Sequence, residues 1–480
     1  MSYKHGTYQQ EGATAFQLPV VLDYGHFIVG TAPIHKVKAE NRKVNEVIRI
    51  GTYQEAIQYF GDTYDLDFSI SQAIKVFFEL YAVAPLYVVN ILDLTKHKSA
   101  KKTLTNKTLE KGKILIPSHK IIPETVVVKN SAGKQVISDA RIVYTSEGLE
   151  IYATVAGNNI DVEYEEVDLS KVTKTEAIGG FDSATMKRTG LELVNEIFLK
   201  YSELPAFIDV PDFSHESDVA AIMETKAKNL NGGMFEAMAL INAPIDKKYN
   251  ELVEWKETNN ILSNDQVILY GKIKLSGEVY YQSIHYAALS MKVDGENNGV
   301  PSQGPSNYSY KMDAFVWKNA SGNYEEIRLD KEQQANFLNK NGVVTAINLK
   351  GWRCWGSETA KNPLATDPKD KFIYGRRMFK YIGNELVISY FGNVDKKFTL
   401  KMAETMKKSM NIRLNALVAA DQLLSAKVNF YAADNSLIDI INGDITWTID
   451  LGIIPGAKSI TFKKVYDVDA LQKFAESLTA

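Results

Sequence analysis

The sequence predicts a multi-domain α/β protein built around a doubly wound sheet. Patterns typical of strands alternate with patterns typical of helices between residues 19 and 92, and the alternation resumes from residue 190. Strands and helices that alternate in this way form parallel sheets with helices on both faces. A length of 480 residues is enough for about three domains.

The front of the chain supplies the first strands and helices of this sheet. The apolar runs "HFIVGTAPI", "NEVIRIG" and "PLYVVNIL" predict strands. A helix is predicted in "TYQEAIQYFG", because Thr52 is a suitable N-cap and Gly61 a suitable stop. The stretch "SISQAIKVFFELYA" predicts a second, amphipathic helix.

Residues 93–175 interrupt the alternation with short β-patterned runs that Asn, Gly and Ser separate. This pattern predicts a small all-β domain inserted in the α/β domain. The predicted division is an N-terminal arm at 1–18, a discontinuous main domain at 19–92 and 176–300, the insertion at 93–175, and a C-terminal α/β domain at 301–480.

The C-terminal third combines a long helix with strands near the end of the chain. Apolar residues recur at helical spacing in "LKMAETMKKSMNIRLNALVAADQLL". The later stretch "ITWTIDLGIIPGAKSITFKK" predicts two strands joined by a turn at Pro455-Gly456. An isolated ribbon of two strands is marginal in water and leaves both edges unpaired, so the sequence raises the question of which chain completes it. One face of the first strand carries Ile445, Trp447, Ile449 and Leu451.

Composition and charge argue against several classes of protein. The 55 basic and 58 acidic residues nearly cancel, so no overall field attracts nucleic acid. The single cysteine, Cys354, excludes an intramolecular disulfide framework. The first residues lack the apolar core of a secretory signal, and no stretch approaches the ~20 apolar residues of a membrane span. We therefore expect a protein made in the cytoplasm that does not insert in membranes.

The motifs of common enzymes are missing. Neither of the phosphate-binding patterns G-x-x-x-x-G-K-[ST] and G-x-G-x-x-G occurs. The G-x-S-x-G motif of serine hydrolases is also missing. The seven histidines are scattered singly, without the spacing of a metal site. We therefore expect no catalytic residues, cofactor or metal. One alternative is a metal-dependent α/β enzyme that uses Asp209, Asp212 and Asp246 at the ends of predicted strands. Helix capping explains these aspartates more simply, because Ser214 and His215 stand at a predicted helix start.

A basic segment lies on the long C-terminal helix. The segment from Asp395 to Lys427 contains seven basic and three acidic residues. Such a run is usually a solvated face, but it also suits an acidic partner.

Several blocks in a fixed order resemble the contractile tail sheath proteins. "FIVGTAPI" and "SISQAIKVFFELYAVAPLYVVNILD" precede "EAIGGFDSATMKRTGLELV", whose "IGG" and "TGL" resemble the return to the main domain after a variable insertion. "ENNGVPSQGPSN", "LNKNGVVTAINLKGWRCWGSETA", "FIYGRRMFKYI" and "LIDIINGDITWTIDLGIIPGAKSITFKK" follow in the order of that family. The N-terminal "HGTYQQEG" differs from the frequent Pro-Gly-Val-Tyr opening of sheaths.

The resemblance implies a structural subunit rather than an enzyme. Sheath subunits stack as six-fold rings around an inner tail tube, with baseplate and terminator proteins at the ends, and contraction drives the tube through a bacterial envelope. Their terminal strands are exchanged between subunits. The residues that would take part here are Tyr3, Tyr8, Phe16, Leu18, Ile445, Trp447, Ile449, Leu451, Ile460 and Phe462. The basic helix would face the tube through Lys401, Lys408 and Arg413.

The resemblance also implies where the protein acts. Assembly would take place in the bacterial cytoplasm, and the product would be a virion tail or a phage-tail-like bacteriocin released by lysis. The sequence fits both particles. A self-assembling surface protein is a further alternative, but it would need an export signal that this sequence lacks.

Overall fold

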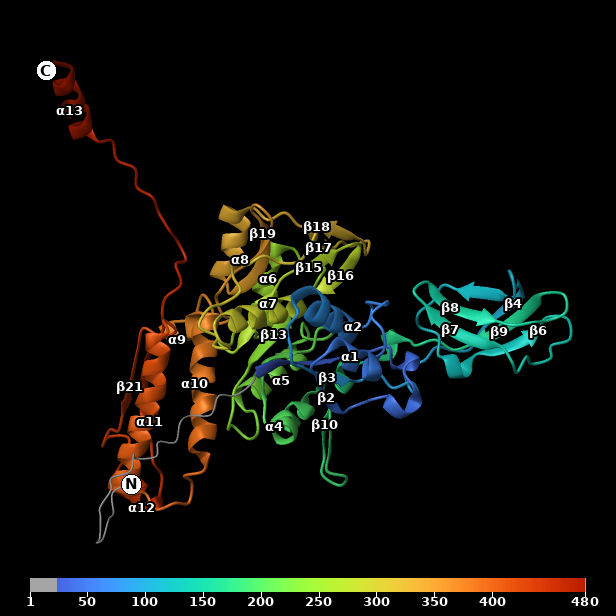
Figure 1. Ribbon diagram of the computed structural model, residues 1–480, viewed down its shortest axis with the longest axis horizontal. Coiled ribbons are helices and arrows are strands. Elements are labelled where there is room, and N and C mark those ends of the chain that lie inside the picture. Colours follow the sequence, from blue (N-terminus) through green and yellow to red (C-terminus); the bar gives the residue numbers. More distant parts are fainter. Residues whose placement is uncertain (1–23, 480) are drawn as a thin grey trace, which may run out of the picture.

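Figure 1 shows the computed structural model of the chain, which describes residues 24–479. Its centre is an eight-stranded sheet with six parallel strands and an antiparallel strand at each edge. The predicted doubly wound α/β core is therefore confirmed. The strands, in spatial order, are β2 (Val47–Ile50), β3 (Leu86–Asn90), β1 (Tyr24–Gly30), β12 (Leu204–Asp209), β13 (Met238–Asn242), β14 (Gln266–Leu269), β19 (Val343–Asn348) and β20 (Trp352–Trp355).

Helices cover both faces of this sheet, with α2 and α7 on one side and α4 and α5 on the other (Figure 1). Helix α1 forms as predicted, because the Thr52 side chain accepts a hydrogen bond from the Glu55 amide at 3.3 Å. Gly61 ends it at φ 86°, in a conformation that favours glycine. The helices of this body are α1 (Tyr53–Phe60), α2 (Ser69–Ile74), α3 (Lys174–Ile178), α4 (Glu196–Tyr201), α5 (Ser217–Lys228), α6 (Leu252–Thr258), α7 (Gln282–Glu296) and α8 (Asn336–Lys340).

The predicted start of the C-terminal domain at residue 301 does not match the sheet. Strands β19 and β20 complete the main sheet, and their residues Val343, Val344 and Cys354 are buried in its core. The sequence division failed here because the turn-rich loop after α7 separates these strands from the rest of the sheet along the chain. A four-stranded sheet flanks this body: β16 (Glu278–Tyr281), β15 (Lys272–Leu275), β17 (Ala314–Lys318) and β18 (Tyr324–Glu326). A separate hairpin pairs β10 (Gly180–Asp182) with β11 (Lys187–Thr189).

Residues 102–164 form two three-stranded antiparallel sheets that project from the main body (Figure 1). Side chains such as Ile116, Leu149 and Ile151 make a core of their own between these sheets. One sheet consists of β4 (Lys102–Thr108), β9 (Asn159–Tyr164) and β6 (Val127–Asn130); the other of β5 (Lys113–Ile116), β8 (Gly148–Tyr152) and β7 (Arg141–Thr145).

The chain from residue 368 onward forms a second body, of helices and a two-stranded sheet, that lies beside the main sheet (Figure 1). In residues 24–479, no helix is both long enough and apolar enough to cross a membrane. The elements of this region are α9 (Pro368–Lys371), α10 (Ile373–Phe391), α11 (Leu400–Ala419), β21 (Ser425–Asn429), α12 (Leu437–Asn442), β22 (Thr448–Gly452) and α13 (Val468–Thr479).

Candidate assembly surfaces

The C-terminal body consists of α10, α11, β21 and β22 around a small apolar core. Met378, Leu414 and Leu417 are at most 1% exposed in this core. Leu424, which the sequence pattern placed on the apolar face of the long helix, is 66% exposed because α11 ends at Ala419. The core is therefore shorter than the periodicity predicts.

The sheet of this body contains two antiparallel strands, β21 and β22, and no third strand pairs with either within residues 24–479. Ser425 pairs with Gly452 at one end and Asn429 with Thr448 at the other. Trp447, Ile449 and Leu451 pack against the core of the C-terminal body. Both edges of the sheet thus offer backbone donors and acceptors to a further strand. Ile445 lies just before β22 and is partly exposed.

The predicted hairpin at Pro455-Gly456 is wrong. Strand β22 pairs with β21, which precedes it, and residues 453–467 form neither helix nor strand. The Gly456 amide donates a hydrogen bond to the Tyr374 hydroxyl at 2.9 Å, and Lys458 pairs with Glu358. These contacts hold the turn against the start of α10, so the chain continues away from β22 instead of folding back on it (Figure 1).

Residues 457–467, which we call the C-terminal arm, carry apolar side chains into solvent. Ile460 is 69% exposed and Phe462 is 84% exposed. The remaining predicted exchange residues, Tyr3, Tyr8, Phe16 and Leu18, lie outside the described residues.

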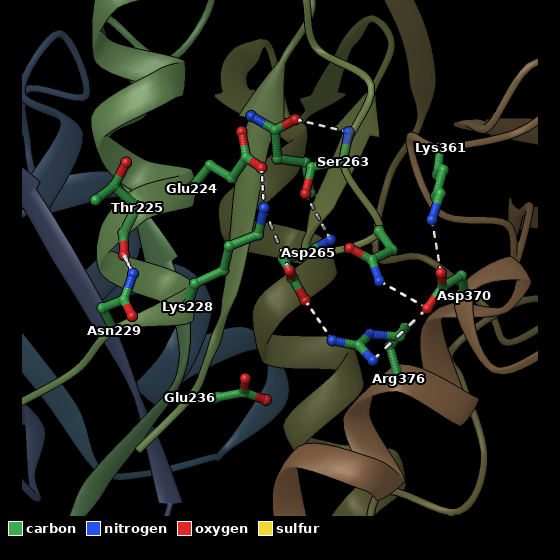
Figure 2. A network of polar contacts seen from close by, with 12 residues as sticks. Glu224, Thr225, Lys228, Asn229, Glu236, Ser263, Asp265, Lys361, Asp370 and Arg376 are labelled. Carbon is green, nitrogen blue, oxygen red and sulfur yellow. Dashed lines mark hydrogen bonds and ion pairs between the residues drawn. The ribbon is translucent and has the colours of Figure 1, made fainter. Parts of the chain in front are cut away.

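A polar network joins the C-terminal body to the main body (Figure 2). Asp265, which precedes β14 and is 2% exposed, accepts hydrogen bonds from Arg376 at 2.9 Å and Lys380 at 2.7 Å, both on α10. Burial alone would raise the pKa of Asp265, but the two cations outweigh it and lower the pKa. Asp370 extends the network by accepting from Asn264 at 2.7 Å and Lys361 at 2.6 Å.

The next residue of α10, Arg377, makes a second link to the main body. Its guanidinium donates two hydrogen bonds to the carboxylate of Asp294 on α7, one of them at 3.0 Å. It also lies 4.6 Å from the ring centre of Phe207 on β12. Burial raises the pKa of Asp294, and Arg377 opposes that rise. The sequence analysis missed both links. The signal available was three basic residues at positions 376, 377 and 380 in the first half of a helix whose other residues there are mostly apolar.

The three predicted tube-facing residues differ in their surroundings. Lys401 and Lys408 are exposed on α11. Arg413 instead donates a hydrogen bond to Glu385 on α10 at 2.7 Å and another to the Tyr381 hydroxyl at 3.2 Å. Glu385 is 3% exposed, so this ion pair is a link between α10 and α11. Arg413 therefore serves packing within the chain.

Two of the three aspartates of the enzyme alternative lie near each other, one fully buried and one partly buried. Asp209 is fully buried 3.6 Å from the buried His26, and Asp212 accepts hydrogen bonds from Ser69 at 2.6 Å and Tyr281 at 2.9 Å. Burial raises the pKa of both carboxyl groups. Asp246 is exposed.

Asp209 ends β12 and Asp212 follows it, next to the point between β1 and β12 where the strand order reverses and open α/β sheets usually bind ligands. Side chains of the protein occupy this position instead. Among residues 24–479, no group of three His, Cys, Asp or Glu side chains could hold a metal ion. The geometry therefore gives the enzyme alternative no metal centre.

Comparison with known proteins identifies relatives of one kind. No family model matches the chain. The chain is 23% identical over 297 residues to the major tail sheath protein of Serratia phage KSP20, covering 61% of this chain and 72% of that protein. It is also 23% identical over 320 residues to a prophage major tail sheath protein of Pseudomonas aeruginosa (strain UCBPP-PA14), covering 65% of this chain and 78% of the relative.

Solved structures with the same fold cover almost the whole chain. The sheath of the extracellular contractile injection system PVC in its contracted state has a TM-score of 0.59 at 11% identity, and covers 98% of this chain and 99% of its own. The contracted helical sheath of the anti-feeding prophage has a TM-score of 0.58 at 14% sequence identity. The match covers 97% of this chain and 100% of that sheath chain. These comparisons confirm the resemblance identified in the sequence.

Proposed function

We propose that this chain, a structural protein of the contractile tail sheath family, polymerises in stacked rings around an inner tube. Contraction of the stack then drives the tube through a bacterial envelope. The tail tube, the baseplate and a terminator protein are the partners of this proposal. The particle is assembled in the bacterial cytoplasm and leaves the cell as a virion tail or a phage-tail-like bacteriocin.

One observation supports polymerisation most directly: the two-stranded sheet of β21 and β22 lacks further strands in residues 24–479, while the C-terminal arm exposes apolar side chains. A strand added from another subunit gains backbone hydrogen bonds, and alternating side chains fix its register. We assign this exchange to residues 3–18 and 445–464. A head-to-tail contact of this kind does not close on itself, so it propagates along a helical assembly.

The division of labour among the domains is part of the same proposal. Residues 19–92 and 176–300 supply most of the main body, and residues 1–18 are the N-terminal arm. Residues 301–367 complete the main body with β19 and β20, and residues 368–480 supply the C-terminal body with its terminal strands. The insertion at 93–175 projects outward, where its exposed loops do not interfere with ring stacking.

The exposed lysines of α11, Lys401 and Lys408, are the proposed contacts to the tube. Their reversal to glutamate should weaken co-sedimentation with the tube in a salt-dependent way, because exposed charges are screened by salt. Unchanged co-sedimentation would assign tube contact to another surface. Arg413 is excluded from this test, because its loss would break the link between α10 and α11.

The experiment that tests the proposal is negative-stain electron microscopy of the purified chain, alone and with its tube protein. Hollow, striated cylinders are the expected result. A matched variant that lacks residues 2–17 should remain folded and monomeric. Particles that stay separate even with the tube present would contradict the sheath proposal, and long tubes from the truncated variant would contradict the role of the N-terminal arm.

A further inference from the structure

Helix α13 follows the C-terminal arm and has an apolar stripe that no segment of residues 24–479 covers. Val468, Leu471, Phe474 and Leu478 recur at helical spacing and are 63%, 51%, 58% and 70% exposed. A 12-residue helix of ordinary composition is marginal in water unless its apolar face is buried. The stripe therefore suits docking in a groove.

A cleft of suitable character lies between the end of α10 and the start of α11. Its volume is about 290 Å³, and Tyr390, Met402, Thr405 and Met406 are among the residues that line it. Methionine side chains adapt their shape to an inserted apolar group. Exposed apolar residues continue the surface at this end of the body: Phe391 (59%), Val394 (63%) and Leu400 (78%).

We propose that α13 of one copy docks in the α10–α11 cleft of a neighbouring copy. The charges of the two elements are complementary. Apart from Lys401 and Lys408, which we assign to the tube, residues 393–408 carry Lys396, Lys397 and Lys407 against Asp395 and Glu404, whereas residues 466–480 carry Asp467, Asp469 and Glu476 against Lys473. Opposite net charges favour encounter of the two surfaces and set their orientation.

The direction of the C-terminal arm selects a second copy rather than the same chain. The arm is held at Tyr374, near the first residue of α10, and the cleft is at the other end of that 19-residue helix, about 28 Å away. In Figure 1, α13 lies beyond the start of α10, on the side opposite to the cleft. A copy displaced in that direction presents its own cleft to α13.

This inference rests on the proposed function, because it needs neighbouring copies, and it adds an anchor distinct from the exchanged strands. Strand pairing uses backbone groups of residues 445–464, whereas α13 inserts side chains in a groove. A helix anchor beyond a flexible arm holds neighbours together while other contacts between them change.

Disulfide capture between two pools of the full chain tests the docking. One pool carries Phe474→Cys with an N-terminal tag, and the other carries Met406→Cys without it, so the mixed dimer has a distinct size on a non-reducing gel. The native Cys354 is fully buried and stays out of the reaction. The matched control replaces Phe474→Cys by Lys473→Cys, which lies on the opposite face of α13.

We expect the mixed dimer to form at least about tenfold faster with Phe474→Cys than with Lys473→Cys, in assembled cylinders and in the concentrated chain. Equal rates, or no mixed dimer in either sample, would overturn the docking. An intrachain disulfide in the double variant Met406→Cys/Phe474→Cys at high dilution would also overturn it, in favour of docking within one chain. Cylinders without the mixed dimer would refute the docking alone, whereas the mixed dimer without cylinders supports the docking and counts against the sheath proposal.

Discussion

The inserted β domain and the C-terminal region differ in how many of their large apolar side chains are exposed to solvent. The insertion buries Ile151, Ile160 and Val162 completely and exposes only three large apolar side chains within residues 102–164: Leu115, Val136 and Tyr152. The C-terminal region buries a short core and exposes a long series of large apolar residues from Phe391 to Leu478.

The difference shows which part of the chain is complete by itself. In the insertion, ion pairs such as Lys113–Glu150 and Lys129–Glu163 lie on the outside of two sheets that pack around a shared apolar core. In the C-terminal region, a sheet with two open edges stands next to an exposed apolar arm. Exposed apolar surface of this extent marks an interaction site. The insertion therefore covers its own apolar core, whereas the C-terminal region leaves apolar surface exposed for the strand exchange proposed above.

The largest expected difference is between two deletions, one at the C-terminus and one of the insertion, in their effect on cylinder formation. Deleting residues 459–480 should abolish cylinder formation while the thermal midpoint of the remaining monomer stays unchanged, because the deletion keeps the Lys458–Glu358 ion pair and removes no residue of either core. Electron microscopy and a thermal melt are the two measurements. Cylinders of normal length from this variant would show that the C-terminal arm and α13 are not needed for assembly.

The matched deletion replaces residues 100–165 with a short glycine linker. The ends to be joined are adjacent, because the Ser99 amide donates to the Glu166 carbonyl at 2.7 Å. This variant should still form cylinders, since the insertion has its own core. Failure to assemble would place the insertion among the contacts between subunits.

The second effect concerns the link between the C-terminal body and the main body. Asp265→Asn should lower the free energy of unfolding by about 3–5 kcal/mol, because it removes the buried carboxylate nearest to Lys380 and Arg376. These cations then keep only the longer contacts to Glu236 at 3.4 Å and Asp370 at 3.7 Å. Urea denaturation measures the change. The control Asp139→Asn, at an exposed position of the insertion, should change it by less than about 0.5 kcal/mol.

The pH dependence of the same variant has a defined sign. The pKa of Asp265 in the folded chain is lowered from 3.8, so its contribution to stability is complete above pH 3.8 and is lost as the pH falls through the folded-state pKa. The stability difference between wild type and Asp265→Asn should therefore stay constant from neutral pH to about pH 4 and shrink below it. A difference that already shrinks at pH 6 would contradict this assignment.

Smaller effects should come from the two separate cores. Ile151→Ala in the insertion and Leu417→Ala in the C-terminal body should each cost about 2–5 kcal/mol locally, because both side chains are at most 1% exposed. Hydrogen exchange should locate each loss in its own region. Cylinder formation should survive Ile151→Ala and weaken with Leu417→Ala. The opposite result would mean that the insertion, and not the C-terminal body, contributes to contacts between subunits.

The smallest effect on the monomer should come from the C-terminal arm. Phe462→Ala should change the free energy of unfolding by less than about 0.5 kcal/mol, because the side chain is 84% exposed. The same substitution should raise the concentration of chain needed for cylinders, which light scattering measures. A destabilised monomer would mean that the arm already packs on its own chain.

Local signals in the sequence predicted elements well where each element carries its own boundaries. Thr52 and Gly61 delimit α1 correctly, since an N-cap and a glycine stop act within a few residues. Helix α7 was missed because most of its side chains, Tyr286 and Leu289 among them, are buried around its whole circumference. A helix buried on every side has no amphipathic period to detect.

Pairing between distant segments was the weaker part of the prediction. The sequence placed β22 in a hairpin with the residues that follow it, whereas its partner β21 precedes it with α12 in between. Strand β21, "SAKVN", is too short and too polar to be recognised on its own. The link from Asp265 to Arg376 and Lys380 spans more than 100 residues along the chain, and no local pattern indicates such a contact.

The sequence by itself determined the α/β class, the order of the blocks and the resemblance to tail sheath proteins, because periodicity, caps and block order are local properties of the chain. Only the tertiary structure decided that β19 and β20 complete the main sheet, that Arg413 links α11 to α10, and that the C-terminal arm extends away from the C-terminal body. These features depend on which charged side chains pair with each other and on which strand edges remain unpaired. Both are set by the packing of segments that are far apart in the sequence.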